Sequence, residues 1–88
     1  MIQKTEIVHK IAMENNYYMH DVKKIINALI DIIRNEVAAG KAVRISGLGI
    51  FRPAFRRWSS KIYPVVKFSA ARTFRDMLRK QHGVKERE

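Results

Sequence analysis

The longest amphipathic stretch of the sequence constrains the fold most strongly. From about His20 to Ala39, apolar residues recur at the three- and four-residue spacing of an α-helix. The stripe consists of Val22, Ile25, Ile26, Leu29, Ile30, Ile33 and Val37. Ile32 adds an apolar position outside the stripe, and Gly40 is suited to end the helix. This face is too wide for one short helix to cover, so we expect a second subunit; the alternative is that downstream strands cover it alone.

The size and composition of the chain exclude several classes of protein. Its 88 residues fit a single domain, predicted at residues 1–80, with a flexible polar tail at 81–88. Cysteine is absent, which excludes disulfides and thiolate metal sites and fits a reducing compartment. Charged residues interrupt both the N-terminal segment and the longest apolar stretch, which argues against a signal peptide and a membrane span.

The positive charge is concentrated in the second half of the chain. The 18 lysines and arginines outnumber the 8 acidic residues and give a formal net charge of +10. Residues 1–43 carry six bases and five acids, whereas residues 44–88 carry twelve bases and three acids. Such a field attracts polyanions, with nucleic acid favoured over anionic membranes and acidic proteins. The first half is therefore expected to be scaffold and the second to contact the anion.

The segment after Gly40 predicts a short strand at residues 42–45, a break at Gly47-Leu48-Gly49, and an antiparallel hairpin over residues 50–68. With Ser59-Ser60 at the tip, Phe51 faces Phe68. The alternation predicts one packed and one solvated face. The apolar face holds Phe51, Pro53, Phe55, Ile62, Pro64, Val66 and Phe68. The other face holds Arg52, Ala54, Arg56, Trp58, Lys61, Tyr63, Val65 and Lys67.

The residue types at the tip and within the strands restrict the geometry of this hairpin, and the sequence predicts two further helices. Neither serine favours positive φ, so a looser tip is expected, and the two prolines require strand edges or bulges. A first helix is predicted at residues 3–15, ended by Asn15-Asn16. Ser69 is predicted to cap a third helix. Its inner side would carry Ala70, Ala71, Phe74, Met77 and Leu78.

Catalytic and metal chemistry find no support in the sequence. His9, His20 and His82 are scattered over different elements, without the convergent ligands that a metal site needs. The serines lack a base and an orienting acid at a recognisable spacing. Gly47-Leu48-Gly49 lacks the third glycine of a dinucleotide loop. We therefore predict no enzyme, no cofactor and no small-molecule substrate.

Phosphate binding is better supported, because arginine donates hydrogen bonds to phosphate in pairs. Basic residues cluster on the hairpin and the following helix: Arg52, Arg56, Arg57, Lys61, Lys67, Arg72 and Arg75. A helix start at Ser69 would add backbone N–H donors. The alternative is a solvated face that only keeps the protein soluble. Trp58 and Tyr63 admit two roles, namely stacking on bases or packing against a partner at the base of the hairpin.

Several segments in order resemble the bacterial histone-like HU/IHF family. They are Lys4-Thr5-Glu6-Ile7, the long helix ending in Ala39-Gly40-Lys41, Val43-Arg44-Ile45-Ser46-Gly47-Leu48-Gly49-Ile50-Phe51, and Phe68-Ser69-Ala70-Ala71-Arg72-x-Phe74-Arg75-Asp76. The likeness spans residues 2–80, less the middle of the hairpin. It implies an α+β intertwined dimer whose two β-ribbon arms hold duplex DNA through the minor groove. It also implies a cytoplasmic, nucleoid-associated protein, of bacterial or phage origin.

The resemblance and the charge pattern together define two sets of residues. The predicted DNA-binding set is Lys4, Arg44, Ser46, Gly47, Arg52, Arg56, Arg57, Trp58, Lys61, Lys67, Ser69, Arg72 and Arg75. The predicted dimer core is Ile26, Leu29, Ile30, Ile33, Phe51, Phe68 and Phe74. The partners implied are double-stranded DNA and a second copy of the chain or a paralogous subunit.

The chain departs from the family in its arm. Only sixteen residues, 52–67, separate the two phenylalanines, and Trp58-Ser59-Ser60 stands where the family has a proline-bearing tip. A strand of eight residues reaches at most about 26 Å. We therefore predict mostly sequence-independent duplex binding through phosphates, with reduced bending. The second hypothesis is a protein-interaction or assembly module that has lost most DNA binding.

Overall fold

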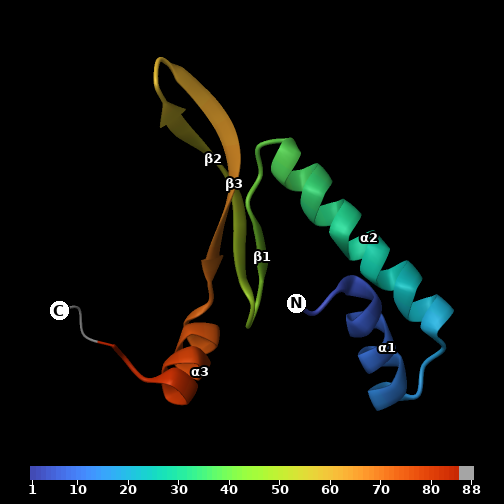
Figure 1. Ribbon diagram of the computed structural model, residues 1–88. Helices are drawn as coiled ribbons and strands as arrows, with labels where there is room; N and C mark the ends of the chain where they lie inside the picture. Colours follow the sequence, from blue (N-terminus) through green and yellow to red (C-terminus); the bar gives the residue numbers. More distant parts are fainter. Residues whose placement is uncertain (86–88) are drawn as a thin grey trace. The chain divides into compact units, whose positions relative to one another are not determined.

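The computed structural model describes residues 1–85 and has an α+β fold of three helices and one antiparallel sheet (Figure 1). The elements are α1 (Lys4–Asn15), α2 (Met19–Ala38), β1 (Val43–Ile45), β2 (Gly49–Trp58), β3 (Lys61–Ala70) and α3 (Arg72–His82). The chain divides into two compact units. The helical unit comprises residues 1–34, and the sheet unit begins at Asn35.

In the helical unit, α1 ends at the predicted asparagine pair. Asn16 adopts the left-handed conformation, with φ of 58°, and its N–H bonds to the carbonyl of Ala12. The side chain of Asn15 donates a second bond of 2.9 Å to the Ile11 carbonyl. Asparagine tolerates positive φ better than most residues, which explains why the helix stops here.

The buried core of the helical unit is small. Its buried side chains are Val8, Ala12 and Val22, with Ile11 and Ile26 packed against them while still partly exposed. Three buried side chains are few for an independently stable fold, because small domains have little apolar surface to bury.

Helix α2 forms where the apolar periodicity predicted it, and its 20 residues give a length of about 30 Å. The chain leaves the helix at Ala39 and Gly40, and Gly40 takes a positive φ of 91°. Ile25, Leu29 and Ile32 form an exposed stripe at helical spacing, which we call the α2 stripe. Ile32, which the periodicity had set apart, belongs to this stripe.

The sheet has the order β1-β2-β3, and its register confirms the predicted hairpin. Phe51 pairs with Phe68, Arg52 with Lys67, and Trp58 with Lys61 at the last pair before the tip. The rings of Phe51 and Phe68 lie 4.8 Å apart between centroids. These two phenylalanines therefore join the strands at the point where the hairpin leaves β1.

Beyond Phe51, strands β2 and β3 continue as a two-stranded ribbon, residues 52–67 (Figure 1). Strand β1 pairs with β2 only from Gly49 to Phe51, so both ribbon strands have a free edge. Pro53 and Pro64 both lie in this region. A free edge tolerates the missing N–H of proline, as the sequence predicted.

The expected loose tip is wrong. Only Ser59 and Ser60 separate the paired residues Trp58 and Lys61, so the turn is a tight two-residue loop. Ser59 adopts a φ of 57°, the positive value that a type II′ hairpin turn requires at its first loop position. The closely matched strand pairs hold the serine in a conformation that it does not favour on its own.

The expectation of a packed apolar face is wrong beyond the phenylalanine pair. Phe55, Ile62 and Val66 are 74%, 61% and 67% exposed, whereas Phe51 is half-buried. The physical reason is the end of β1 pairing at Phe51, beyond which no element of residues 35–85 lies over the ribbon. The apolar face of the ribbon is therefore a surface of this chain.

Two expectations for the third helix are also wrong. Ser69 does not cap it, because Ser69 lies in β3 opposite Ile50, and Ala71 is the N-cap without a side-chain acceptor. The predicted inner side is not buried either, since Phe74, Met77 and Leu78 are all exposed and α3 has no buried residue. Within residues 1–85, none of the helices combines the length and the apolar composition of a membrane span.

The predicted tail overlaps the end of α3. The helix continues through His82, two residues into the segment assigned to the tail. Gly83 follows with a φ of 69°, and its N–H bonds to the Arg79 carbonyl. The last part of the predicted tail, residues 86–88, lies outside the described residues.

Candidate nucleic-acid interface

A tight turn between β1 and β2 organises the first group of candidate residues. The Leu48 N–H bonds to the Ile45 carbonyl at 3.0 Å, and Gly47 has a φ of 86°. This is the conformation that a type II turn needs at its third residue, which explains the glycine. The Leu48 carbonyl accepts a 2.9 Å bond from the Ala71 N–H, so the turn also holds the start of α3.

Gly49 allows the strands to approach closely beside this turn. A Cβ built at Gly49 would overlap the Ser69 carbonyl oxygen and stand 2.8 Å from the Phe68 ring. Any larger residue must therefore push β3 and the Phe68 ring away. The close approach keeps Ser69 and the β1–β2 turn beside each other.

These constraints bring five predicted DNA-binding residues to one hollow of about 400 Å³. They are Arg44, Ser46, Gly47, Ser69 and Arg72. The start of α3 also borders the hollow, and the N–H groups of a first helical turn have no intrahelical acceptor. Two guanidinium groups, two hydroxyls and these N–H groups form a set of donors suited to phosphate oxygens.

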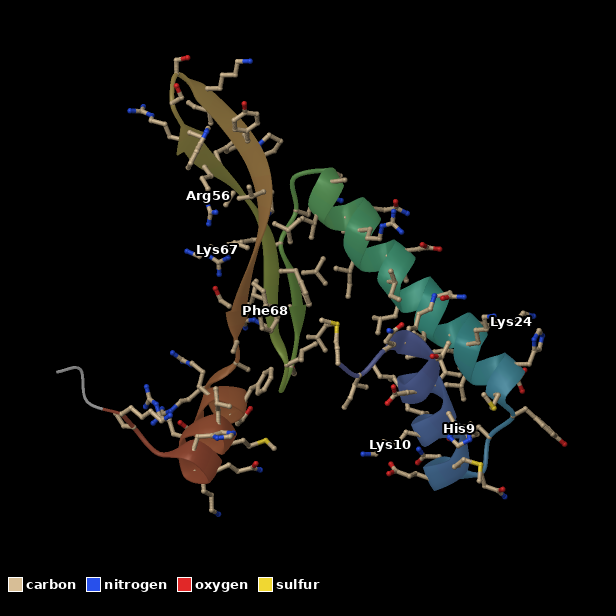
Figure 2. The ribbon with its side chains drawn as sticks, viewed as in Figure 1. His9, Lys10, Lys24, Arg56, Lys67 and Phe68 are labelled. Atoms are coloured by element: carbon tan, nitrogen blue, oxygen red, sulfur yellow. The ribbon has the colours of Figure 1, made fainter. Side chains whose placement is uncertain are left out.

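The second group of candidates lies on one face of the ribbon. By the register, Arg52, Arg56, Lys61 and Lys67 share this face with Trp58 and Tyr63. We call it the basic face, and Figure 2 shows Arg56 and Lys67 projecting from the same side of the ribbon. None of its four cations forms an ion pair within residues 1–85. The sequence has no acidic residue between Glu36 and Asp76, so no carboxylate of the strands competes with phosphate for these cations.

The structure separates Arg57 from the basic face. Arg57 pairs with Ile62, which places it on the apolar face of the ribbon. The clustering of arginines along the chain could not make this distinction, although the period of two in the strand carries the signal. Arg57 thus borders the apolar residues, while Arg56 and Trp58 point to the opposite side.

Helix α3 carries Arg75 and, on the same face, Arg79, which is not in the predicted DNA-binding set. Arg72, Arg75 and Arg79 follow at three- and four-residue spacing, so they share a face of the helix. Arg72 lies 3.9 Å from Asp76, an exposed contact of the kind worth little in water. The helical period was the signal that could have added Arg79.

The remaining predicted DNA-binding residue, Lys4, lies in the helical unit. Its ammonium group donates a 2.9 Å hydrogen bond to the side-chain oxygen of Asn27. This exposed bond ties the first turn of α1 to α2 within the unit. Lys4 therefore belongs to a different unit from the other predicted DNA-binding residues.

The predicted dimer core is incompletely buried in the single chain. Ile26, Ile30 and Ile33 are half-buried, and Leu29 is 43% exposed. In the sheet unit, Phe51 is half-buried, while Phe68 and Phe74 are exposed. Leu29, Phe68 and Phe74 are therefore apolar residues on the surface of the single chain.

The described residues provide no other candidate chemistry of comparable strength. Within residues 1–85, no group of three histidine, aspartate or glutamate side chains could hold a metal ion. A hollow of about 740 Å³ beside α1 is lined by Ile2, Thr5, Glu6, Ile7, His9, Lys10, Ile11, Glu14 and Met19. Because the lining combines acidic, basic and apolar residues, it does not indicate a particular class of ligand.

Comparison with known proteins identifies relatives of this architecture. The sequence model of the family described as bacterial DNA-binding protein matches residues 2–64. Among solved structures, HU from Thermotoga maritima has 23% identity and a TM-score of 0.72, covering 88% of this chain and 98% of that chain. A point mutant of the same HU has 22% identity and a TM-score of 0.72, with coverage of 88% and 99%.

A third similar structure is an Anabaena HU–DNA cocrystal structure. It has 22% identity and a TM-score of 0.79, covering 88% of this chain and 97% of that chain. At these identities the solved structures establish the likeness of the fold, and the family model establishes the relationship of the sequences.

Proposed function

The chain belongs to the bacterial DNA-binding protein family of HU and IHF, and from this membership we propose that it is a dimeric architectural protein that binds duplex DNA. In this proposal the basic face of the ribbon, the hollow beside the β1–β2 turn and the arginines of α3 contact DNA phosphates. The role is binding rather than catalysis, and the protein associates with the nucleoid.

The basic face carries the proposal. Four cations stand on one side of a ribbon that has no acidic residue in either strand. Phosphate contacts fix a protein on the duplex without reading sequence, which supports binding that is mostly sequence-independent. The solved HU–DNA complex supports the use of this fold on DNA.

A salt series tests this function directly. We expect unrelated duplexes of equal length to bind with similar affinity, measured by fluorescence anisotropy or mobility shift. The logarithm of the affinity should fall linearly with the logarithm of the salt concentration, with a slope of about −0.9 per phosphate contact. Absence of binding to every duplex at low salt would contradict the proposal.

Dimerisation is the second part of the proposal, supported by the apolar surface of the single chain. The α2 stripe, Phe68 and Phe74 are all exposed, while the described residues bury only four hydrophobic side chains. Burying apolar surface against a second copy stabilises the fold by roughly 25 cal/mol per Å² removed from water. Sedimentation equilibrium should report a dimer, with either the same chain or a paralogous one as the second subunit.

The third part of the proposal is that the protein bends DNA only weakly. Seven residue pairs, from Arg52–Lys67 to Trp58–Lys61, extend past β1, giving a ribbon of about 23 Å. A short ribbon offers few contacts to offset the energy of bending DNA. A single-site bending assay by energy transfer should show a modest angle, and a sharp bend would overturn this part alone.

One observation favours a second candidate function. The apolar face of the ribbon exposes Phe55, Ile62 and Val66, and exposed apolar patches often bind other proteins. In this alternative the fold serves as a protein-interaction or assembly module. The salt series separates the two functions, because only the DNA-binding function predicts a duplex shift at low salt.

A further inference from the structure

The tip of the ribbon combines two exposed aromatic rings with two cations. By the register, Arg56 lies opposite Tyr63 and Trp58 opposite Lys61, all on the basic face. Trp58 is 72% exposed and Tyr63 is 45% exposed. We call these four residues the tip patch.

The aromatic rings of the tip patch have no structural role in the described chain. Phe51 and Phe68 form the aromatic pair found in residues 1–85, and neither Trp58 nor Tyr63 stacks on a ring or a cation there. Trp58 belongs to the last strand pair before the turn, at the end of the ribbon farthest from Phe51. Of its two possible roles, packing at the base of the ribbon therefore has no geometric support.

We propose that the tip patch is a base-stacking subsite for unpaired nucleobases of DNA. This inference rests on the proposed function and adds contact with bases to contact with phosphates. Flat aromatic rings beside a positively charged track are the arrangement by which proteins bind single strands, since each base has a face that can stack. Bases within a continuous duplex already stack on their neighbours, so unpaired bases fit the exposed rings better.

The placement of the two aromatic residues in the register supports this assignment. Trp58 and Tyr63 are diagonal neighbours on one face of an antiparallel pair, so their Cα atoms lie roughly 7–8 Å apart. Diagonal neighbours are within reach of each other for aromatic side chains, so both rings can serve the same short stretch of single strand. Arg56 and Lys61 flank the rings and can contact the phosphates on either side of the base.

Trp58 is the only tryptophan of the chain, so its fluorescence reports on the tip directly. We expect a single-stranded thymidine oligonucleotide to quench this fluorescence at saturation. Inorganic polyphosphate, bound to the same occupancy, should leave it nearly unchanged, because it has charge but no bases. Equal quenching by both would overturn the proposal, as would quenching by polyglutamate and not by the oligonucleotide, which would assign the patch to acidic proteins.

Substitutions supply the second measurement. Trp58→Ala should lower the ratio of single-strand to duplex affinity about ten-fold, and Trp58→Phe should restore most of it. Phe55→Ala is the matched control, because Phe55 is equally exposed but lies on the apolar face. Equal ratios for Trp58→Ala and Phe55→Ala would refute the subsite.

The two proposals fail separately in this design. If the unchanged protein binds neither duplex nor single strand at low salt, the proposed function fails. If it binds duplex normally and the ratio does not respond to Trp58, only the subsite fails. Circular dichroism of each variant checks that the fold is retained.

Discussion

The helical unit and the sheet unit use their side chains differently. Residues 1–34 contain three of the four buried hydrophobic side chains, packed between α1 and α2. The sheet unit extends a ribbon with cations on one face and exposed apolar residues on the other. Because a buried side chain cannot contact a ligand and an exposed cation adds little to stability, the two units are suited to different tasks. We expect the helical unit to control assembly and the sheet unit to control DNA binding.

The largest expected effect comes from the α2 stripe. Leu29→Glu combined with Ile32→Glu places charges on a surface that dimerisation would bury, where an unpaired charge costs several kcal/mol. We expect the dimer dissociation constant to rise at least about 100-fold, measured by sedimentation, and duplex binding to fall with it. Lys24→Glu is the control, because Lys24 is exposed on the same helix outside the stripe. If the double variant has an unchanged dimer dissociation constant, the α2 stripe is not part of the dimer interface.

The basic face should give the next largest effect, and only on DNA binding. Replacing Arg52, Arg56 and Lys67 with alanine should weaken duplex binding about 100-fold at low salt and reduce the salt slope by about 0.9 per lost contact. Sedimentation should still report a dimer.

A matched control removes the same charge from the helical unit. Lys10, Lys23 and Lys24 are exposed there, and their replacement with alanine changes the net charge equally. We expect a much smaller loss of duplex affinity. If both triple variants lose affinity equally, net charge rather than the basic face explains binding, and the contrast between the units disappears.

Substitution at Gly49 tests the packing that holds the sheet unit together. Gly49→Ala should lower the free energy of unfolding by about 2 kcal/mol or more, because the added methyl group meets the Ser69 carbonyl and the Phe68 ring. Gly47→Ala has open space around it and only the strain of positive φ, so its cost should be about 1 kcal/mol. Chemical denaturation measures both. A larger loss of stability for Gly47→Ala than for Gly49→Ala would contradict this explanation.

The smallest effect is expected at the ribbon tip. Ser59→Gly should stabilise the protein by up to about 1 kcal/mol, because glycine adopts positive φ without steric cost. Ser60→Gly provides the comparison, since Ser60 does not have positive φ and should lose a few tenths of a kcal/mol. Thermal unfolding of the two variants should therefore shift in opposite directions.

Much of the fold could be predicted because it depends on local patterns. The periodicity from Val22 to Val37 predicted α2, and the alternation around Ser59-Ser60 predicted the whole ribbon register. The turn conformation and the helix cap could not be predicted in the same way. Ser59 takes positive φ because ten paired residues on each strand hold it there, and Ser69 is kept in β3 by pairing with Ile50.

In the candidate site too, some residues could be identified from the sequence, whereas others needed the tertiary structure. The sequence identified the cations of the ribbon, but grouped Arg57 with Arg56 because they are neighbours in the chain. The hollow needed the tertiary structure, since the 2.9 Å bond between Ala71 and Leu48 joins segments that are more than twenty residues apart. The alternation had already placed Tyr63 on the same face as Arg56 and Trp58, and the register confirms this.

The sequence by itself determined the kind and order of the helices and strands, the pairing of β2 with β3, and the excess of positive charge. These follow from side-chain periodicity and composition, which act over a few residues at a time. Only the tertiary structure decided which side chains are exposed and which donors converge. Apolar residues such as Phe55 and Leu29 are exposed because residues 1–85 contain too little surface to cover them. Exposure depends on what the rest of the molecule covers, and a local pattern does not carry that information.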